Sequence, residues 1–346
     1  MCSINFGSKV MDIPIIQGGM GVGVSLGNLS GSVAREGGMG VISAVGIGFR
    51  EEGYLENSIE KNKIALKKEI DKAKDISEGR GLLAVNVMTA IKDFEEMVKS
   101  SSEFGADAVI CGAGLPLNLP ELVGEETLIA PIVSSKRALD LIVRTWKKRY
   151  NRYPDFVVVE GPKAGGHLGF KENEIRELKL EDIVLEISAY LTDLEAETNK
   201  KIYLFAAGGI RNNEDRLKMK KLGADGVQVA TPFIATEECD VSIEFKEAIV
   251  NAKDSDLEII HSPAGFLARA VKNDFLDSVD YSDVPKRRCI DCLKTCDPRK
   301  TPYCISKALS NSAKGRLNVV FSGENINGID KITTVKEVIK TLMEEK

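Results

Sequence analysis

The chain has 346 residues, 43% of them hydrophobic and 29% charged, and its formal net charge is −5. These proportions are typical of a soluble globular protein, and the acidic balance gives no electrostatic reason to expect nucleic acid or an anionic membrane as a partner. No apolar run approaches the roughly 18–20 residues that span a bilayer, and the first residues lack a signal-peptide pattern. Seven cysteines, an odd number, favour a reducing compartment over a disulfide scaffold. We therefore expect a cytoplasmic protein with a small-molecule substrate.

Short apolar segments alternate with longer amphipathic segments over the first two thirds of the chain. The predicted strands are 13–16, 40–43, 82–86, 108–111, 128–133, 156–159, 202–206 and 226–229. Most are apolar throughout, which is typical of parallel strands buried on both faces. The main predicted helices are 56–76, 93–104, 135–150, 180–198 and 213–222. This alternation predicts an α/β fold, a (β/α)₈ TIM barrel, and counting strands leaves a doubly wound open sheet as the alternative.

The pattern changes at about residue 237. Two amphipathic segments, 241–252 and 264–273, precede a charged connection and four cysteines. The predicted parts are a barrel at 1–236, a small, mainly helical addition that bears the cysteines at 237–314, and a C-terminal segment returning to the barrel at 315–346. Thr333 or Thr334 ahead of Glu337 predicts the N-cap of a closing helix.

The turn after the sixth predicted strand is the most informative one. Gly161, Pro162, Gly165 and Gly166 end the strand, and His167 follows them, one of only two histidines. α/β folds build active sites from a buried parallel strand, a glycine-rich turn at its carboxyl end and a titratable side chain there. His167 is therefore the candidate catalytic residue, and a histidine in an ordinary surface loop is the alternative.

Glycine-rich turns follow several other predicted strands, and a barrel would gather them at one face, lined by backbone N–H groups. The turns after the seventh and eighth strands, AAGGI and QVATPF, have the character of a phosphate cradle. The sequence contains no GxxxxGK[ST] motif, and its early glycines lack the GxGxxG spacing. A nucleotide-hydrolysing P-loop and a nicotinamide-binding Rossmann fingerprint are thus poorly supported.

A family resemblance connects these motifs. IPIIQGGM, NVM, GAG, EGPKAGGHLG, AAGGI and QVATPF occur in the order found in the nitronate monooxygenase family, formerly called 2-nitropropane dioxygenases. The FMN-dependent enoyl-ACP reductases are related and have similar motifs. The resemblance implies a barrel that binds FMN non-covalently, with His167 as the catalytic histidine of AGGHxG. It also implies oxidation of alkyl nitronates by dioxygen to carbonyl compounds and nitrite.

The resemblance also implies which residues contact the flavin. They are Gly18, Gly19 and Met20 beside the ring, Asn86 near it, Glu160 at the ribityl hydroxyls, Gly165 in the flavin-side turn, and Ala207, Gly208, Gly209, Ala230 and Thr231 at the phosphate. Residues 322–325 resemble a late segment that returns to the flavin. The chain departs from the family at Pro232, where a GTRF motif often supplies an arginine.

Four cysteines, Cys289, Cys292, Cys296 and Cys304, fall within sixteen residues. They could supply the thiolates of a zinc site or an iron–sulfur cluster, although the spacing matches neither a standard zinc ribbon nor a ferredoxin motif. A set of reduced structural thiols is the alternative.

Three other functions stay open. An FMN-dependent enoyl-ACP reductase and an NAD(P)H:quinone reductase would use the same flavin site with NAD(P)H, so the barrel motifs do not separate them from a nitronate monooxygenase. A flavin-free sugar-phosphate isomerase or lyase barrel belongs to another class and predicts a colourless protein. The sequence also leaves a homodimer open.

Overall fold

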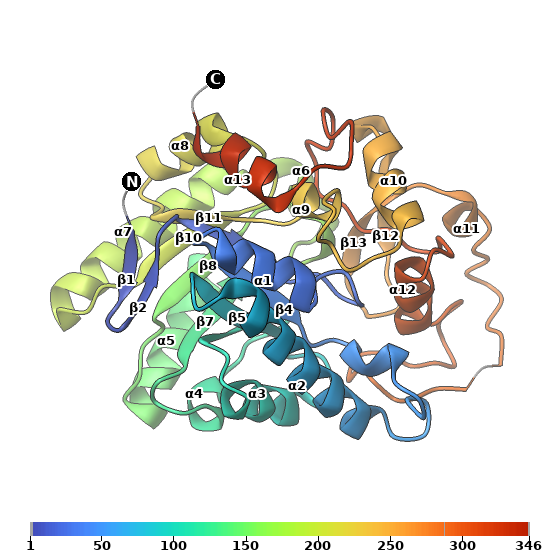
Figure 1. Cartoon of the computed structure of the whole chain (residues 1–346), viewed down its shortest axis with the longest axis horizontal. Helices are drawn as coiled ribbons and strands as arrows, with labels where there is room; N and C mark the ends of the chain where they lie inside the picture. The colour runs from blue at the N-terminus through green and yellow to red at the C-terminus, as the bar shows by residue number, and fades with distance from the viewer. Residues whose placement is uncertain (1–2, 287, 345–346) are drawn as a thin grey trace.

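Eight parallel strands close into a barrel in the computed structural model, which describes residues 3–286 and 288–344 (Figure 1). The strands are β3 (Ile15–Gln17), β4 (Met39–Ser43), β5 (Leu82–Met88), β6 (Ala108–Gly112), β7 (Leu128–Val133), β8 (Phe156–Glu160), β10 (Tyr203–Ala207) and β11 (Gly226–Val229). β11 pairs with β3, with Val227 opposite Ile15, and this pairing closes the barrel. The predicted TIM barrel is confirmed, and each predicted strand overlaps one of these eight.

Helices surround the barrel, and all of those named here except α6 bury side chains in the core. They are α1 (Gly27–Arg35), α2 (Ser58–Ser77), α3 (Phe94–Glu103), α4 (Leu119–Leu122), α5 (Lys136–Tyr150), α6 (Glu172–Glu177), α7 (Leu180–Thr198), α8 (Asn213–Lys221), α9 (Thr231–Ile234) and α13 (Val335–Met343). The five predicted helices correspond to α2, α3, α5, α7 and α8. The predicted N-cap of α13 is also confirmed, because the Thr334 hydroxyl accepts from the Glu337 N–H at 3.3 Å.

Helix α1 has no counterpart among the predicted helices. Its sequence, GNLSGSVAR, contains two glycines and no long apolar periodicity. A Cβ on Gly31 would lie 2.8 Å from the carbonyl oxygen of Ala73 on α2. The glycine that lowers helix propensity therefore permits the close packing of α1 on α2, and tertiary contact overrides the local preference.

A short hairpin plugs the amino end of the barrel. Its strands, β1 (Ile4–Phe6) and β2 (Lys9–Met11), are antiparallel. The Phe6 ring lies 5.6 Å from the ring of Phe156 and 5.0 Å from that of Tyr203, measured between centroids, and these two residues begin β8 and β10. The hairpin covers the amino end of the barrel, and the strand-end turns lie at the opposite, carboxyl end.

Aspartates connect neighbouring strands at the amino end. Each directly precedes a strand, and its carboxylate accepts a hydrogen bond from a backbone N–H of the strand beside it. The three bonds join Asp107 to Leu83 (2.9 Å), Asp155 to Ile129 (2.9 Å) and Asp225 to Leu204 (2.8 Å). A charged acceptor strengthens such a bond, so these contacts help to fix the strand register.

The segment after the barrel contains both helices and strands. Its elements are α10 (Ile243–Asn251), a 3₁₀ turn η2 (Asp254–Asp256), β12 (Leu257–His261), β13 (Leu267–Val271), α11 (Asp274–Asp277) and α12 (Ile305–Ala313). The prediction of a helical segment at 264–273 was wrong, because this stretch forms β13. The Gly265 N–H donates to the Ser262 carbonyl at 2.9 Å, and the resulting turn pairs β13 with β12. On its other side β13 pairs with β9 (Gly166–Leu168). The division at 1–236, 237–314 and 315–346 stays a prediction.

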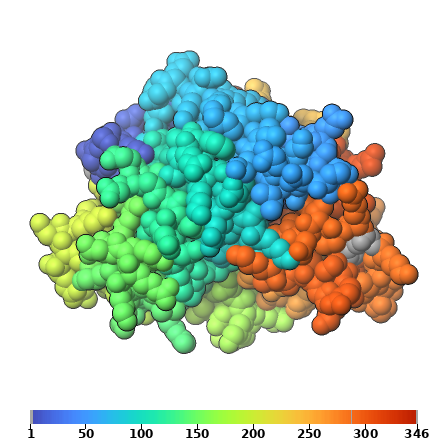
Figure 2. Space-filling model, turned by 90° about the horizontal axis from the view of Figure 1, so that it is seen from below, coloured from blue at the N-terminus to red at the C-terminus, as the bar shows by residue number. Residues whose placement is uncertain are grey.

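The addition packs beside the early part of the chain, as the orange and blue surfaces of Figure 2 show. Arg288 donates to the Glu56 carboxylate at 3.2 Å, and Lys92 forms an ion pair with Asp291. Within the described part of the chain, no helix has the length and apolar character needed to cross a bilayer.

We predict that Asp225→Ala lowers the free energy of unfolding by about 1–3 kcal/mol, because the Leu204 N–H loses its charged acceptor. Asp71→Ala is the matched control, because Asp71 is half exposed and forms only a surface pair with Lys67, so its loss should change stability by less than about 1 kcal/mol. Urea denaturation measures both variants. Equal stability of the Asp225 variant and the wild type would contradict the prediction.

Candidate functional site

A cavity of about 440 Å³ lies at the carboxyl ends of the barrel strands. Every residue predicted to contact the flavin lines it, together with His167 and residues 322–325. The predicted residues are Gly18, Gly19, Met20, Asn86, Glu160, Gly165, Ala207, Gly208, Gly209, Ala230 and Thr231. These positions come from strand ends far apart in the sequence, and barrel closure brings them to one cavity.

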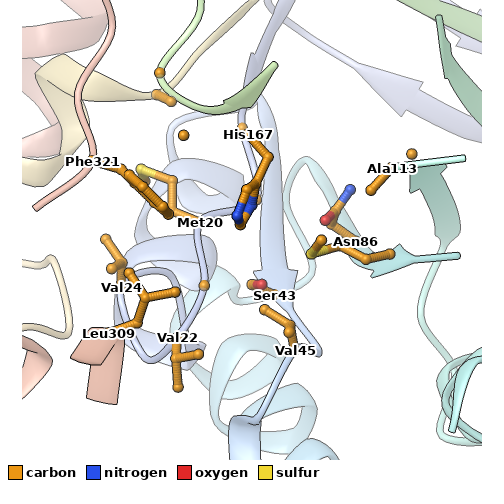
Figure 3. Close-up of a pocket in the computed structure, with 18 of the residues that line it drawn as sticks. Met20, Val22, Val24, Ser43, Val45, Asn86, Ala113, His167, Leu309 and Phe321 are labelled. Atoms are coloured by element: carbon orange, nitrogen blue, oxygen red, sulfur yellow. The ribbon is translucent and has the colours of Figure 1, made fainter. Parts of the chain in front are cut away.

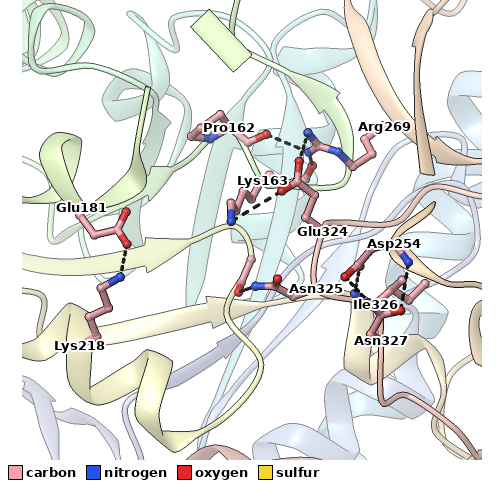
Figure 4. A network of polar contacts seen from close by, with 12 residues as sticks. Pro162, Lys163, Glu181, Lys218, Asp254, Arg269, Glu324, Asn325, Ile326 and Asn327 are labelled. Atoms are coloured by element: carbon pink, nitrogen blue, oxygen red, sulfur yellow. Dashed lines mark hydrogen bonds and ion pairs between the residues drawn. The ribbon is translucent and has the colours of Figure 1, made fainter. Parts of the chain in front are cut away.

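The turn after β8 is tied to the C-terminal segment by a buried guanidinium. Arg269, on β13, is 3% exposed. Its Nη1 donates to the carbonyl oxygens of Pro162 (2.8 Å) and Ala164 (2.5 Å), and its Nη2 donates to the Glu324 carboxylate at 2.8 Å (Figure 4). Burial lowers the pKa of Arg269 and the Glu324 charge opposes this shift. Arg269 thus holds three segments in one arrangement.

The candidate phosphate cradle is a hydrogen-bonded unit. Gly208 has a φ of 106°, and a Cβ there would lie 3.1 Å from both the Ala164 nitrogen and the Gly161 oxygen. The Thr231 hydroxyl accepts from the Gly323 N–H at 2.9 Å. A residue other than glycine at position 208 would therefore have a strained backbone conformation, and its Cβ would crowd the Ala164 nitrogen and the Gly161 oxygen.

Asn86 connects two strand ends below the cavity. Its amide donates to the carbonyl oxygen of Ile110 at 3.3 Å. A Cβ on Gly19 would lie 2.5 Å from the Asn86 Cβ, so only glycine fits against this side chain. The two residues fix each other's position in the cavity wall.

His167 lies on β9, and its ring points into the cavity between Met20 and Asn86 (Figure 3). Its Nε2 lies 2.8 Å from the Ser262 hydroxyl oxygen. Aromatic rings flank it, with centroids at 5.2 Å for Phe321 and 5.9 Å for Phe266. Burial lowers the pKa of His167 to about 4, so the imidazole is neutral near pH 7.

Sequence reasoning missed Ser262. It is 6% exposed and lies in the turn between β12 and β13, 95 residues from His167 in the chain. Its neighbour His261 lies on β12 and is exposed. Only the pairing of β13 with β9 brings Ser262 to the histidine, and no motif around IIHSP signals it.

Glu160 ends β8 in the cavity wall. Burial raises the pKa of its carboxyl to about 7. Desolvation disfavours the carboxylate here just as it disfavours the imidazolium of His167. Both groups are therefore mainly uncharged at pH values between about 4 and 7.

One of the four clustered cysteines reaches the cavity. Cys292 lines it, and burial together with the nearby thiols of Cys304, Cys289 and Cys296 raises the Cys292 pKa to about 12. Yet among residues 3–286 and 288–344, no group of three or more His, Cys, Asp or Glu side chains is placed to hold a metal ion. The structure thus does not support the predicted zinc or iron–sulfur site. The cysteine segment instead forms cavity wall, with the Lys92 N–H donating to the Cys292 carbonyl at 3.0 Å.

Comparison with known proteins identifies the family. The family model described as "Nitronate monooxygenase" matches residues 6–345. The chain belongs to the nitronate monooxygenase family. A probable nitronate monooxygenase of Staphylococcus aureus strain JH9 is 27% identical over 173 residues, which is 49% of this chain and 45% of that protein. In strain Newman a protein of the same name is 30% identical over 133 residues, 38% of this chain and 36% of that one. The matched stretch thus spans less than half of each relative.

Solved structures share the fold of this family member. FabK from Thermotoga maritima has a TM-score of 0.72 at 23% identity and covers 96% of this chain and 92% of its own. Nitroalkane oxidase from Streptomyces ansochromogenes has a TM-score of 0.69 at 17% identity and covers 96% of this chain and 95% of its own. These similarities show that the fold, including the part after the barrel, is shared over 96% of this chain.

We predict that Glu160→Gln stabilises the flavin-free protein increasingly as the pH rises. The Glu160 pKa is raised from 4.5 to about 7 in the folded state, so its stabilising effect is complete below pH 4.5 and is lost as the pH rises through 7. Glutamine does not titrate, and the difference in unfolding free energy should grow by about 1.4 kcal/mol for each pKa unit of the shift. Denaturant melts between pH 4.5 and 8 measure it. A difference that does not vary with pH would contradict the assignment.

Proposed function

We propose that the protein is an FMN-dependent oxidoreductase that oxidises alkyl nitronates with dioxygen to carbonyl compounds and nitrite. The observation that carries this proposal is a neutral His167 held by Ser262 in the same cavity as the glycine cradle. Membership of the nitronate monooxygenase family supports it. The names of the Staphylococcus aureus relatives agree, although the matched stretches cover less than half of those proteins.

The residues present fit FMN. Gly208, Gly209, Ala230 and Thr231 would hold its phosphate through backbone N–H groups and a hydroxyl, and glycine permits the closest approach of backbone to a ligand. In the same wall, Gly18, Gly19 and Met20 would lie against the ring, with Asn86 beside it, Gly165 in the adjoining turn, Glu160 near the ribityl hydroxyls and Ala207 beside the phosphate. Arg211 and Lys163 also line the cavity next to the cradle and supply positive charge there. Bound FMN would supply the electron acceptor for the nitronate and the electron donor for dioxygen.

His167 is suited to activate neutral nitroalkanes. A neutral imidazole accepts the proton from the carbon that bears the nitro group, and the electron pair of the broken C–H bond moves onto the nitro oxygens to give the nitronate. The resulting imidazolium then stabilises the nitronate anion. Ser262 bonds the Nε2 atom and so orients the ring, and because its hydroxyl can both donate and accept, it keeps this bond in either imidazole tautomer.

Apolar side chains surround the reacting end. Val22, Val45, Leu309 and Phe321 line the cavity near His167 (Figure 3). Their contact with an alkyl chain would exclude water from the nitronate and from the histidine. Burial of the imidazole accounts for the low His167 pKa, which keeps the base unprotonated at neutral pH.

Anaerobic mixing tests the proposed function. The purified protein should be yellow, its extracted cofactor should have the mass of FMN, and an alkyl nitronate should bleach the flavin. Readmitted dioxygen should then restore the colour and give nitrite. Bleaching by NADH or NADPH without reaction of a nitronate would instead identify an enoyl-ACP or quinone reductase, and a colourless protein would favour the sugar-phosphate enzyme.

We predict that His167→Asn reduces turnover of neutral nitroalkanes by about 10²–10⁴-fold, because a positioned base typically contributes that much. Preformed nitronate has already lost the proton and should be oxidised with a smaller loss.

Ser262→Ala should move the acid limb of the pH–rate profile, and Ser262→Thr should restore it because threonine keeps the hydroxyl. Flavin content is the control for both positions. Equal loss on both substrates in His167→Asn would make His167 a binding group rather than a base.

A further inference from the structure

The cavity continues beyond the flavin-site residues to a polar end. Tyr54, Ser58, Asn62, Asp93 and Ser306 line it there. Tyr54 follows the 3₁₀ turn η1 (Ile47–Arg50), Ser58 and Asn62 lie on α2, Asp93 precedes α3, and Ser306 lies on α12. We call these five residues the distal polar group. None of them takes part in the chemistry proposed above.

Asp93 is held with its carboxyl in the cavity wall. It occupies the N-cap position of α3, but its side chain makes no capping hydrogen bond to that helix. The carboxyl instead accepts from the Asn62 amide nitrogen at 2.9 Å, and the Asn62 amide oxygen accepts from the Gly48 N–H at 2.9 Å. Asn62 is 5% exposed, so this chain of bonds is rigid. An aspartate that could have capped a helix is turned toward the cavity.

The surroundings of the Asp93 carboxyl disfavour its charged form. Desolvation raises its pKa, the Glu96 charge adds a smaller rise, and the Asn62 hydrogen bond, a backbone hydrogen bond and the nearby Lys294 oppose this shift. Among the described residues, no lysine or arginine forms an ion pair with it. A partly buried carboxylate that has no ion-pair partner is stabilised by a hydrogen-bond donor that enters the cavity.

Tyr54 brings a hydroxyl to the same place. It is 8% exposed, and burial raises its pKa, to which the nearby charges of Cys292 and Asp93 also contribute. The Ser306 hydroxyl lies close enough to act on the Tyr54 pKa as a hydrogen-bond partner. The distal polar group therefore offers an acceptor at Asp93 beside hydroxyls that both donate and accept.

Apolar side chains separate this group from His167. A Cβ on Gly46 would lie 3.4 Å from the methyl groups of Val22 and 3.5 Å from the Tyr54 hydroxyl oxygen, so both side chains border Gly46. Val22 and Val45 in turn lie on the side of the cavity that His167 faces (Figure 3). A ligand that reaches both ends has a reacting group, an apolar middle and a polar tail.

We propose that Asp93, with Tyr54 beside it, selects nitronates that carry a hydroxyl or ammonium group at the end remote from the nitro-bearing carbon. This inference rests on the proposed function and names the substrate class for it. The remote donor satisfies the Asp93 carboxyl, and the alkyl chain packs on the apolar middle. A nitronate that ends in a carboxylate is disfavoured, because its charge meets a second carboxyl in a place with little water.

The test compares nitronates of matched chain length, from three to six carbons, that end in a methyl, hydroxyl, ammonium or carboxylate group. At the length that spans the cavity, the kcat/KM for the hydroxyl or ammonium compound should exceed that for the alkyl compound by about tenfold or more. Asp93→Asn should remove most of this preference. The asparagine oxygen can still accept from Asn62, so the fold is kept.

Glu96→Gln is the matched control. It removes one negative charge from the first turn of α3, but Glu96 is 44% exposed, pairs with Lys63 and does not line the cavity. This variant should keep the wild-type preference. A preference lost equally in both variants would be a long-range charge effect and would overturn the role of Asp93.

A methyl-to-hydroxyl ratio near one at every length, or a preference that survives Asp93→Asn, would overturn the inference. Failure of the proposed function has a different appearance, because then no nitronate is oxidised at all. In that case, calorimetric titration with the neutral nitro alcohols and nitroalkanes still measures how tightly each class binds. Tighter binding of the alcohol that Asp93→Asn abolishes would support selection by Asp93 whatever the reaction is, and equal binding would reject it.

Discussion

The arrangement of the site depends on one buried guanidinium. Arg269 comes from a strand outside the barrel, yet it donates to two carbonyls of the turn after β8 and to Glu324 in the C-terminal segment. Without it, the carbonyls of Pro162 and Ala164 would lose their charged donor, and Glu324, whose side chain is 37% exposed, would keep only its ion pair with Lys163 at 3.8 Å. The barrel alone therefore does not define the cavity. Its glycine turns keep their positions because the later parts of the chain return and hold them.

Burial sets the electrostatics of the cavity. It lowers the pKa of His167 and raises that of Glu160, so the base on β9 and the acid at the end of β8 both favour their uncharged forms. Desolvation also raises the pKa of Asp93, in the distal polar group of the cavity. A molecule that brings charge or hydrogen-bond donors into this cavity therefore meets groups that are poorly solvated by water. Electrostatic contacts are stronger in such surroundings than at the surface.

The sequence predicted the barrel and its strand-end turns well, because both depend on local signals. Runs of apolar residues identify buried parallel strands, and glycines after them identify turns close to a ligand. His167 was found in this way. Ser262 and Asp93 were not, because their significance depends on contacts between distant segments. The strand β13 was missed for a related reason, since pairing with β12 and β9 overrides a sequence that reads as amphipathic helix.

The turns that would hold the cofactor and the proposed base, His167, belong to different sheets. The turns that would hold the cofactor end the barrel strands, whereas His167 belongs to β9, which is hydrogen-bonded to β13 and lies in a separate three-stranded sheet. In that sheet, Ala268 stands opposite His167. A change in the β12–β13 hairpin that leaves Arg269 and its contacts in place would therefore shift the base relative to the cofactor while leaving the cradle intact. Evolution could in this way change which carbon acids react while keeping the turns that would bind the cofactor.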